Sequence, residues 1–344
     1  MGVRGWLLRR AALRPRVLVA ACPYGTRARL LVEAEVAARG WAFALSPAQA
    51  GVLAVCGTPG DELSEAVRVV WGELPEPRAL VSAAPDASAE EVALALDGAV
   101  ETLAEGGGGG FERAAYGEVA MAGRGPDRDG LKLDRLHVPL GPVLVDWPAG
   151  LVVETVLQGD VIQEAAVRAV SAGETGAAFW PPTSCAGAGA GRWAARHLDG
   201  LTRLLGVAGW LGAALEARRL RDLLLAGGGG REVAGDCERL ARRVRGSRVL
   251  RWMLRGLGTV GHGTGVPGWM RGDVLDRAYR WADAGARAVG GPAGDGCAPG
   301  TEAAVALSLL PELLTGTELA VARLIVASLD PDLERLPARQ ATDG

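Results

Sequence analysis

The chain has 344 residues, of which 49% are hydrophobic and 22% are charged, as in ordinary globular proteins. This length is sufficient for two domains, each with a core of its own. The formal net charge of −3 excludes a general attraction to nucleic acid. Its five cysteines are scattered, without a Cys-x-x-Cys pair, and no uncharged run approaches the roughly 18 residues of a membrane span. Because Arg14 and Arg16 interrupt the apolar part of its opening, which makes a poor signal sequence, we expect a cytoplasmic protein.

The first hundred residues alternate short apolar runs with amphipathic stretches. The runs 16–22, 51–57 and 78–84 predict buried strands of a parallel sheet. The stretches 26–40 and 88–104 predict helices between and after them. Strands that alternate with helices in this way predict an α/β domain with a doubly wound parallel sheet.

The turn that follows the second predicted strand, "GTPGDEL", is of a kind that holds a phosphate in many α/β proteins. Here Thr58 is a suitable N-cap, Pro59 suits the first helical position, and Asp61 and Glu62 fall in the first turn. A phosphate site would instead require glycines and a lysine at the start of the helix. The turn therefore predicts a helix cap and excludes a nucleotide enzyme of the phosphate-loop kind.

A change of pattern divides the chain into two predicted domains. The glycine-rich segment 106–111 predicts a flexible linker between a domain over 1–105 and another over 112–344. After this linker, β-branched runs broken by Pro and Gly over 137–167 predict antiparallel β hairpins. The pattern is helical from Arg192 onward. We therefore expect the second domain to be α+β and mainly helical.

The segment 46–84, "SPAQAGVLAVCGTPGDELSEAVRVVWGELPEPRALVSAA", resembles the small iron–sulphur subunit of respiratory complex I and of membrane-bound nickel–iron hydrogenases. The resemblance covers roughly residues 5–84 and combines order, spacing and unusual dipeptides. The residues at matching positions are Ser46, Pro47, Gln49, Ala50, Gly57, Thr58, Pro75, Glu76, Pro77 and Arg78.

Three later blocks resemble the large catalytic or quinone-binding subunit of the same complexes. They cover residues 138–165, 246–260 and 312–339. A small-subunit-like part followed by a large-subunit-like part implies a fused, shortened relative of the two, within the superfamily of complex I and energy-converting hydrogenases. In that superfamily the two subunits pack on each other and rest on a membrane subunit.

The positions that hold metals in this superfamily have changed. A 4Fe–4S cluster needs four converging thiolates, but the tandem cysteine pair of the family reads Ala21-Cys22, and its next cysteine falls in Ser82-Ala83-Ala84. The late nickel-binding pair, Asp-Pro-Cys-x-x-Cys, has become the segment 330–335, "DPDLER". The histidine of the quinone-side motif Gly-Pro-x-His-Pro is Leu144. Cys22 is thus a vestigial cluster-ligand position, and we expect no cofactor; the alternative is a 4Fe–4S cluster.

Few other residues suggest chemistry. His137, His197 and His262 are isolated from one another and from carboxylate pairs, so no metal site is predicted. Cys56 lies within an apolar strand and is expected to be an inert buried thiol. Two interpretations of an arginine-rich stretch remain. It is a surface for acidic partners or lipid headgroups, or it is a face that is solvated or paired with carboxylates. It comprises Arg239, Arg242, Arg243, Arg245, Arg248, Arg251 and Arg255.

Two functions are compatible with these features. The first is a hydrophilic, cofactor-poor subunit of a complex I-like or antiporter-like assembly, peripheral on the cytoplasmic face of the membrane. It would dock onto ion-translocating membrane subunits and other hydrophilic subunits, with Arg78, Arg248, Arg251 and Arg255 as candidates for docking. The alternative is an active oxidoreductase subunit that binds quinone or shares an iron–sulphur cluster with a partner. The sequence identifies no catalytic residue and no nucleic-acid partner.

Overall fold

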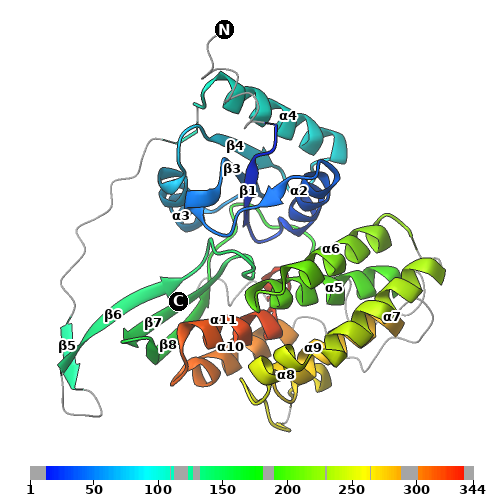
Figure 1. The fold of residues 1–344 in the computed structure, drawn as a ribbon. Helices are drawn as coiled ribbons and strands as arrows, with labels where there is room; N and C mark the ends of the chain where they lie inside the picture. The colour runs from blue at the N-terminus through cyan, green and yellow to red at the C-terminus, as the bar shows by residue number, and fades with distance from the viewer. Residues whose placement is uncertain are drawn as a thin grey trace.

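The structure is a computed structural model, and its description covers most of the chain. The residues described are 13–108, 110–111, 123–126, 132–180, 190–228, 231–263, 265–287 and 301–336. A parallel sheet with its helices forms the upper part of Figure 1, and an antiparallel sheet and a helical region form the lower part. The predicted fold class, an α/β part followed by a mainly helical α+β part, is confirmed.

The upper part is built on a four-stranded parallel sheet of order β2-β1-β3-β4. Its strands are β1 (Arg16–Ala21), β2 (Ala42–Phe43), β3 (Val52–Cys56) and β4 (Ala79–Ala83), and its helices are α2 (Thr26–Ala38), α3 (Asp61–Glu73) and α4 (Ala89–Glu105), with the short helix η1 (Pro47–Gln49). Every residue of β3 is buried because this apolar run is central in the sheet. Residues of α2 and α4 pack on one face of the sheet and residues of α3 on the other.

The start of α3 differs from the prediction. The helix begins at Asp61 with Gly60 as its N-cap, and no side chain caps it. The Thr58 hydroxyl instead donates to Glu174 Oε2 over 3.2 Å. A Cβ on Gly60 would lie 2.5 Å from the carbonyl oxygen of Ser171, so glycine allows a close approach of the two backbones. The predicted Thr58 cap is therefore wrong, because a distant segment of the chain occupies this turn.

The lower part begins with an antiparallel sheet of order β5-β6-β7-β8. Its strands are β5 (Gly123–Pro126), β6 (Lys132–Leu140), β7 (Leu151–Gln158) and β8 (Val161–Ala169). The predicted hairpins over 137–167 are confirmed by this sheet. Strand β7 is its most buried strand, since six of its eight residues are buried.

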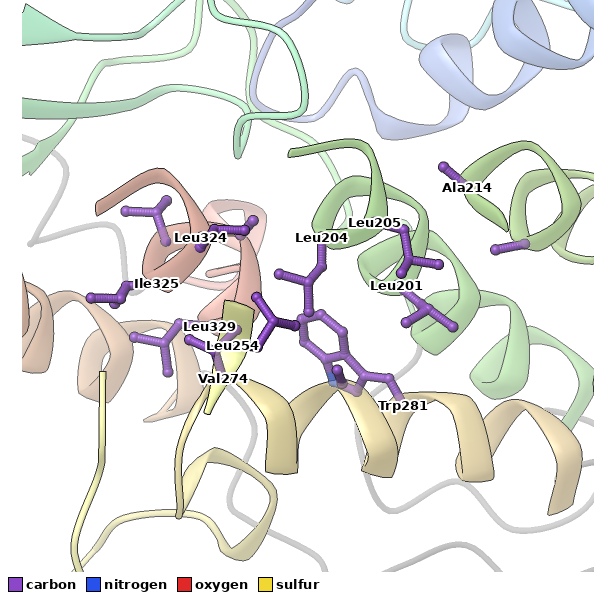
Figure 2. Packing of buried hydrophobic residues seen from close by; sticks show 14 of the residues in the cluster. Leu201, Leu204, Leu205, Ala214, Leu254, Val274, Trp281, Leu324, Ile325 and Leu329 are labelled. Carbon is purple, nitrogen blue, oxygen red and sulfur yellow. The ribbon is translucent and has the colours of Figure 1, made fainter. Parts of the chain in front are cut away.

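The helical region packs around a continuous apolar core. Its elements are α5 (Ala190–Val207), α6 (Leu211–Leu225), α7 (Arg231–Gly246), α8 (Arg248–Leu254), η2 (Gly268–Met270), α9 (Val274–Arg287), α10 (Thr301–Leu314), α11 (Leu319–Leu329) and η3 (Leu333–Arg335). Figure 2 shows Leu201 and Leu204 of α5 near Trp281 of α9, with Leu324 and Leu329 of α11 in the same cluster. Within the ranges described, no helix is both long and apolar enough to cross a membrane.

The two parts share a core. The buried cluster beneath α3 combines Leu53, Leu63 and Trp71 of the upper part with Val152 of β7 and Val170, which directly follows β8. The glycine-rich segment is attached to the upper part as well. Its amides donate to carbonyl oxygens there, Gly107 to Thr102 over 2.8 Å and Gly108 to Arg78 over 3.5 Å. The domain boundary at 106–111 stays a prediction.

Candidate functional site

A buried ring of charged side chains joins the upper part to the helical region. Arg29 and Glu33 come from α2, Asp199 from α5 and Arg221 from α6. Arg29 donates to Asp199 over 2.7 Å and to Glu33 over 2.9 Å, and Arg221 donates to the same two carboxylates over 2.7 Å each. Asp199 is 1% exposed and Arg221 is fully buried. Each guanidinium group thus bridges both carboxylates, which satisfies charges that would be costly to bury alone.

Further ion pairs extend this ring and balance its charge. Arg203 contacts Asp199 and Asp330, Arg218 contacts Glu33, and Arg221 also contacts Asp222. The extended network contains four guanidinium groups and four carboxylates, namely Arg29, Arg203, Arg218, Arg221, Glu33, Asp199, Asp222 and Asp330. Its formal charge is zero, so the network balances its own charges.

The ring stays ionised because its opposite charges outweigh burial. Burial alone would raise the pKa of Glu33, but Arg29, Arg221 and Arg218 lower it to about 2. Burial opposes ionisation of Asp199 too, and Arg29, Arg203 and Arg221 hold its pKa well below its usual range. A carboxylate whose pKa falls on folding stabilises the fold above its unfolded pKa and loses that contribution as the pH falls. The ring therefore stabilises the junction throughout the neutral range.

A second carboxylate connection lies at the amino end of α2. Glu334 of η3 accepts a hydrogen bond from the Thr26 amide over 3.2 Å and another from the Phe179 amide over 2.8 Å. A carboxylate in this position satisfies amides at the start of a helix and complements the helix dipole. The carboxyl-terminal segment thereby holds α2 in place across more than three hundred residues of sequence.

This connection runs through the segment that resembles the late nickel-binding motif. The two positions that correspond to its cysteines are Asp332 and Arg335. Arg335 Nε lies 3.4 Å from Asp332 Oδ2, so these two side chains form an ion pair. Residues with ionic side chains of opposite sign thus stand at the positions that correspond to the cysteines of the motif that this segment resembles.

The residues at the carboxyl edge of the parallel sheet do not fit an iron–sulphur cluster. Cys22 is fully buried just after β1, its amide donates to the carbonyl oxygen of Cys56, and burial raises the pKa of its thiol to about 12. Ser82 and Ala83 end β4 and offer no thiolate. Across the described ranges, no group of three or more His, Cys, Asp or Glu side chains is arranged to hold a metal ion.

A cavity of about 350 Å³ lies beside the ring, between the upper part and the helical region. Its walls come from β1, β2, α5, α6 and the loop 141–147 between β6 and β7. Leu144, the position that corresponds to the quinone-side histidine, is one of the apolar wall residues. This volume falls at the lower end of the range that small-molecule sites occupy.

Three of the residues that line the cavity are exposed leucines. Leu45, Leu211 and Leu215 are 50%, 46% and 54% exposed. Single exposed leucines are normal on a protein surface, but several that line one apolar cavity indicate a contact surface. We call these three residues the leucine rim.

The polar residues that line the cavity include Asp146, Arg203 and Arg218. Burial raises the pKa of Asp146 to about 6, despite the opposing effect of Arg218. A Cβ on Gly206 would lie 2.3 Å from an Asp146 carboxylate oxygen, so glycine is required where this carboxyl meets α5. The Arg218 guanidinium lies 4.0 Å from the centre of the Phe43 ring. A carboxyl that titrates near neutral pH can exchange protons with a molecule in the cavity.

The predicted docking arginines have different environments. Arg78 forms an ion pair with Glu76, lies over the Trp71 ring, and donates to the carbonyl oxygens of Trp71 and Leu74 at the end of α3. Its guanidinium therefore satisfies backbone carbonyl groups at the carboxyl end of α3. Arg248, Arg251 and Arg255 are exposed on α8 or just after it. The structure does not bring Arg78 together with these three residues.

Comparisons with known proteins give a low structural similarity and no match by sequence. No protein-family model matches the chain, and neither does any curated protein. Among solved structures, a chain of the membrane-bound sulfane sulfur reductase, an archaeal respiratory membrane complex, matches with a TM-score of 0.43 and 13% sequence identity. The match covers 59% of this chain and 99% of that chain.

The charged ring can be tested by removing one of its carboxylates. We expect Asp199→Asn to lower the free energy of unfolding by about 3 kcal/mol, because it leaves the buried Arg29 and Arg221 and the half-buried Arg203 short of a counter-charge. The matched control is Asp97→Asn, which removes the exposed partner of Arg39 and is expected to cost less than about 1 kcal/mol. Urea unfolding followed by tryptophan fluorescence measures both. Equal effects of the two substitutions would contradict a central role for the ring.

The raised pKa of Asp146 predicts a contribution to stability that is lost as the pH rises. The contributions of Glu33 and Asp199 are instead lost as the pH falls. The pKa of Asp146 is raised in the folded state, so its ionisation removes stability as the pH rises from about 4 through about 6. We expect Asp146→Asn to match the wild type near pH 4 and to exceed its free energy of unfolding by about 2 kcal/mol above pH 7. Asparagine also tolerates the positive φ of 57° at this position. Urea titrations at several pH values measure the difference, and a constant difference would show that Asp146 does not titrate in this range.

Proposed function

We propose that the chain is a hydrophilic, cofactor-poor subunit of a membrane-bound assembly related to complex I and energy-converting hydrogenases. In this proposal it sits on the cytoplasmic face of the membrane and docks onto ion-translocating membrane subunits. The observation that carries the proposal is the ion pair between Asp332 and Arg335, at the positions of the motif's cysteines. The same segment supplies Glu334, whose carboxylate holds the start of α2.

The charged ring supports a structural role, in which the chain contributes a surface to a larger assembly. Arg29 and Glu33 in the small-subunit-like part bind Asp199 and Arg221 in the large-subunit-like part. The two parts are thereby joined by side chains of the protein itself. A junction of this kind needs no metal to hold it together, which suits a subunit that contributes a surface to a larger assembly.

The leucine rim is the surface that we assign to the membrane partner. Its three side chains are exposed in the isolated chain and would be covered by an apolar surface of a polytopic subunit. The three leucines line the cavity, so a partner seated on them would also shield this side of the cavity from water.

Affinity purification from detergent-solubilised membranes tests this docking. We expect the tagged chain to recover polytopic subunits, and we expect the double substitution Leu211→Asp and Leu215→Asp to lower their recovery at least about fivefold, because two carboxylates would be desolvated at an apolar contact. The control is Leu94→Asp on α4, where a still more exposed leucine lies away from the cavity. Quantitative mass spectrometry measures recovery. A wild-type chain found only in the soluble fraction, with no polytopic partner in mild detergents, would rule out the docking role.

A second candidate function is quinone binding, and the cavity is the observation that favours it. Its wall includes Leu144 and Val145 of the quinone-side motif, and its size suits a ring with a short apolar tail. Arg218 could donate a hydrogen bond to a carbonyl oxygen of such a ring, and Asp146 could exchange a proton with it. In this proposal quinone is a ligand or substrate and not a resident cofactor of the chain.

Equilibrium dialysis with a short-chain ubiquinone tests the second candidate. We expect saturable binding that Leu144→Trp weakens at least about tenfold, because the larger side chain fills part of the cavity. The control is Leu136→Trp, at an exposed leucine of β6. Absence of saturable binding by the wild type would leave the chain as a docking subunit alone.

A further inference from the structure

Helix α8 has a buried side and an outward side of different chemistry. The Ser247 hydroxyl accepts a hydrogen bond from the Leu250 amide over 3.2 Å and caps the helix. Leu250 and Leu254 point into the core of the helical region, where they are 2% and 0% exposed. These contacts fix the rotation of the short helix and therefore determine which residues face outward.

Two large hydrophobic residues occupy the outward side. Trp252 is 82% exposed and Val249 is 67% exposed. They are three positions apart, so they are neighbours on the helix surface. Trp252 is the most exposed of the large hydrophobic residues in the described part of the chain. A tryptophan in that position contributes almost nothing to the core and is available to a partner.

Three arginines complete this outward side. Arg248, Arg251 and Arg255 are exposed, and none of them forms an ion pair with a carboxylate among the described residues. Arg251 donates to the backbone carbonyl oxygen of Arg245. The nearby carboxylate of Asp273 is occupied by the amides of Gly256 and Asp276. The positive charge of this side is therefore uncompensated.

The arginines of the preceding helix provide a contrast. On α7, Arg239 pairs with Asp236, Arg242 with Glu238 at 4.0 Å, Arg243 with Glu216 and Arg245 with Asp283. The arginine-rich stretch thus divides into a paired half on α7 and an unpaired half at α8. Only the unpaired half has an exposed tryptophan beside it.

We propose that the outward side of α8 is a lipid-contact site for an anionic bilayer. Trp252 and Val249 would enter the headgroup region, where tryptophan is favoured because one side of its ring is apolar and its N–H reaches water. Arg248, Arg251 and Arg255 would contact lipid phosphates, which match the guanidinium group in charge and geometry. The inference rests on the proposed attachment to a membrane and names lipid as the contact for this side.

Lipid explains this combination better than an acidic protein does. Anionic lipid presents phosphates over an apolar layer, so charge and hydrophobic residues on one helix side are both satisfied by a single surface. Three arginines and one tryptophan form a weak contact on their own. It would add to docking through the leucine rim and would not replace it.

Cosedimentation of the full chain with vesicles tests the site without any protein partner. We expect binding to vesicles of mixed phosphatidylglycerol and phosphatidylcholine, and much weaker binding to phosphatidylcholine alone. Arg248→Gln, Arg251→Gln and Arg255→Gln together should lower the partition coefficient by about a hundredfold, about fivefold for each charge, and the loss should shrink at high salt. Trp252→Ser should lower binding about tenfold and leave the thermal unfolding curve unchanged, because the side chain is exposed.

The matched control carries the same charge change on α7. Arg239→Gln, Arg242→Gln and Arg243→Gln together should retain nearly wild-type binding to the mixed vesicles. Equal losses in the two triple variants would show that net charge alone drives adsorption and would overturn the site. No binding of the wild type to anionic vesicles would overturn it as well, even if the membrane pull-down succeeds. If the α8 variant then lost partners in that pull-down, the contact would be an acidic protein.

Discussion

The fold depends on how two guanidinium groups and two carboxylates share a site with almost no water. Arg29, Glu33, Asp199 and Arg221 alternate in charge, so each group has two partners of opposite sign. Loss of any one would leave the others buried without compensation, and this interdependence fixes α2 against α5 and α6. The cavity and its leucine rim are formed by the same elements, so their shape depends on the ring.

Ionic contacts and metal ligation are two ways to hold distant segments of a chain together. A metal draws together side chains from distant segments through a few strong bonds, and a charged network does so through many weaker ones. Glu334 illustrates the second solution, since its carboxylate joins the start of α2 to the segment before α5. A network of this kind holds the segments together at neutral pH without a bound metal.

The sequence predicted the fold class because the signals for strands and helices are local. The runs that became β1, β3 and β4 are continuous and apolar, and the hairpins were marked by Pro and Gly. The two-residue strand β2 was missed because two residues show no periodicity. The start of α3 was predicted wrongly because Ser171, more than a hundred residues away, lies against Gly60.

The candidate site was less predictable than the fold. Arg29 and Glu33 are four positions apart in a helix whose Val32 and Val36 are fully buried, which is a local signal of buried charge. Their partners Asp199 and Arg221 had no such signal, since the pairing exists only in three dimensions. The arginine-rich stretch was visible in sequence, but its division into paired and unpaired halves depends in part on Glu216 and Asp283, which other helices contribute.

The leucine rim and α8 lie in different places on the molecule. The rim lies at the junction of the two parts, and Figure 1 shows α8 at the end of the lower part away from the parallel sheet. Each surface is small, so each contact is weak alone. Once one is engaged, however, the other is held at high effective concentration, and the combined affinity exceeds either by orders of magnitude. Two separated contacts also fix the orientation of the chain, which a single contact would leave free to rotate.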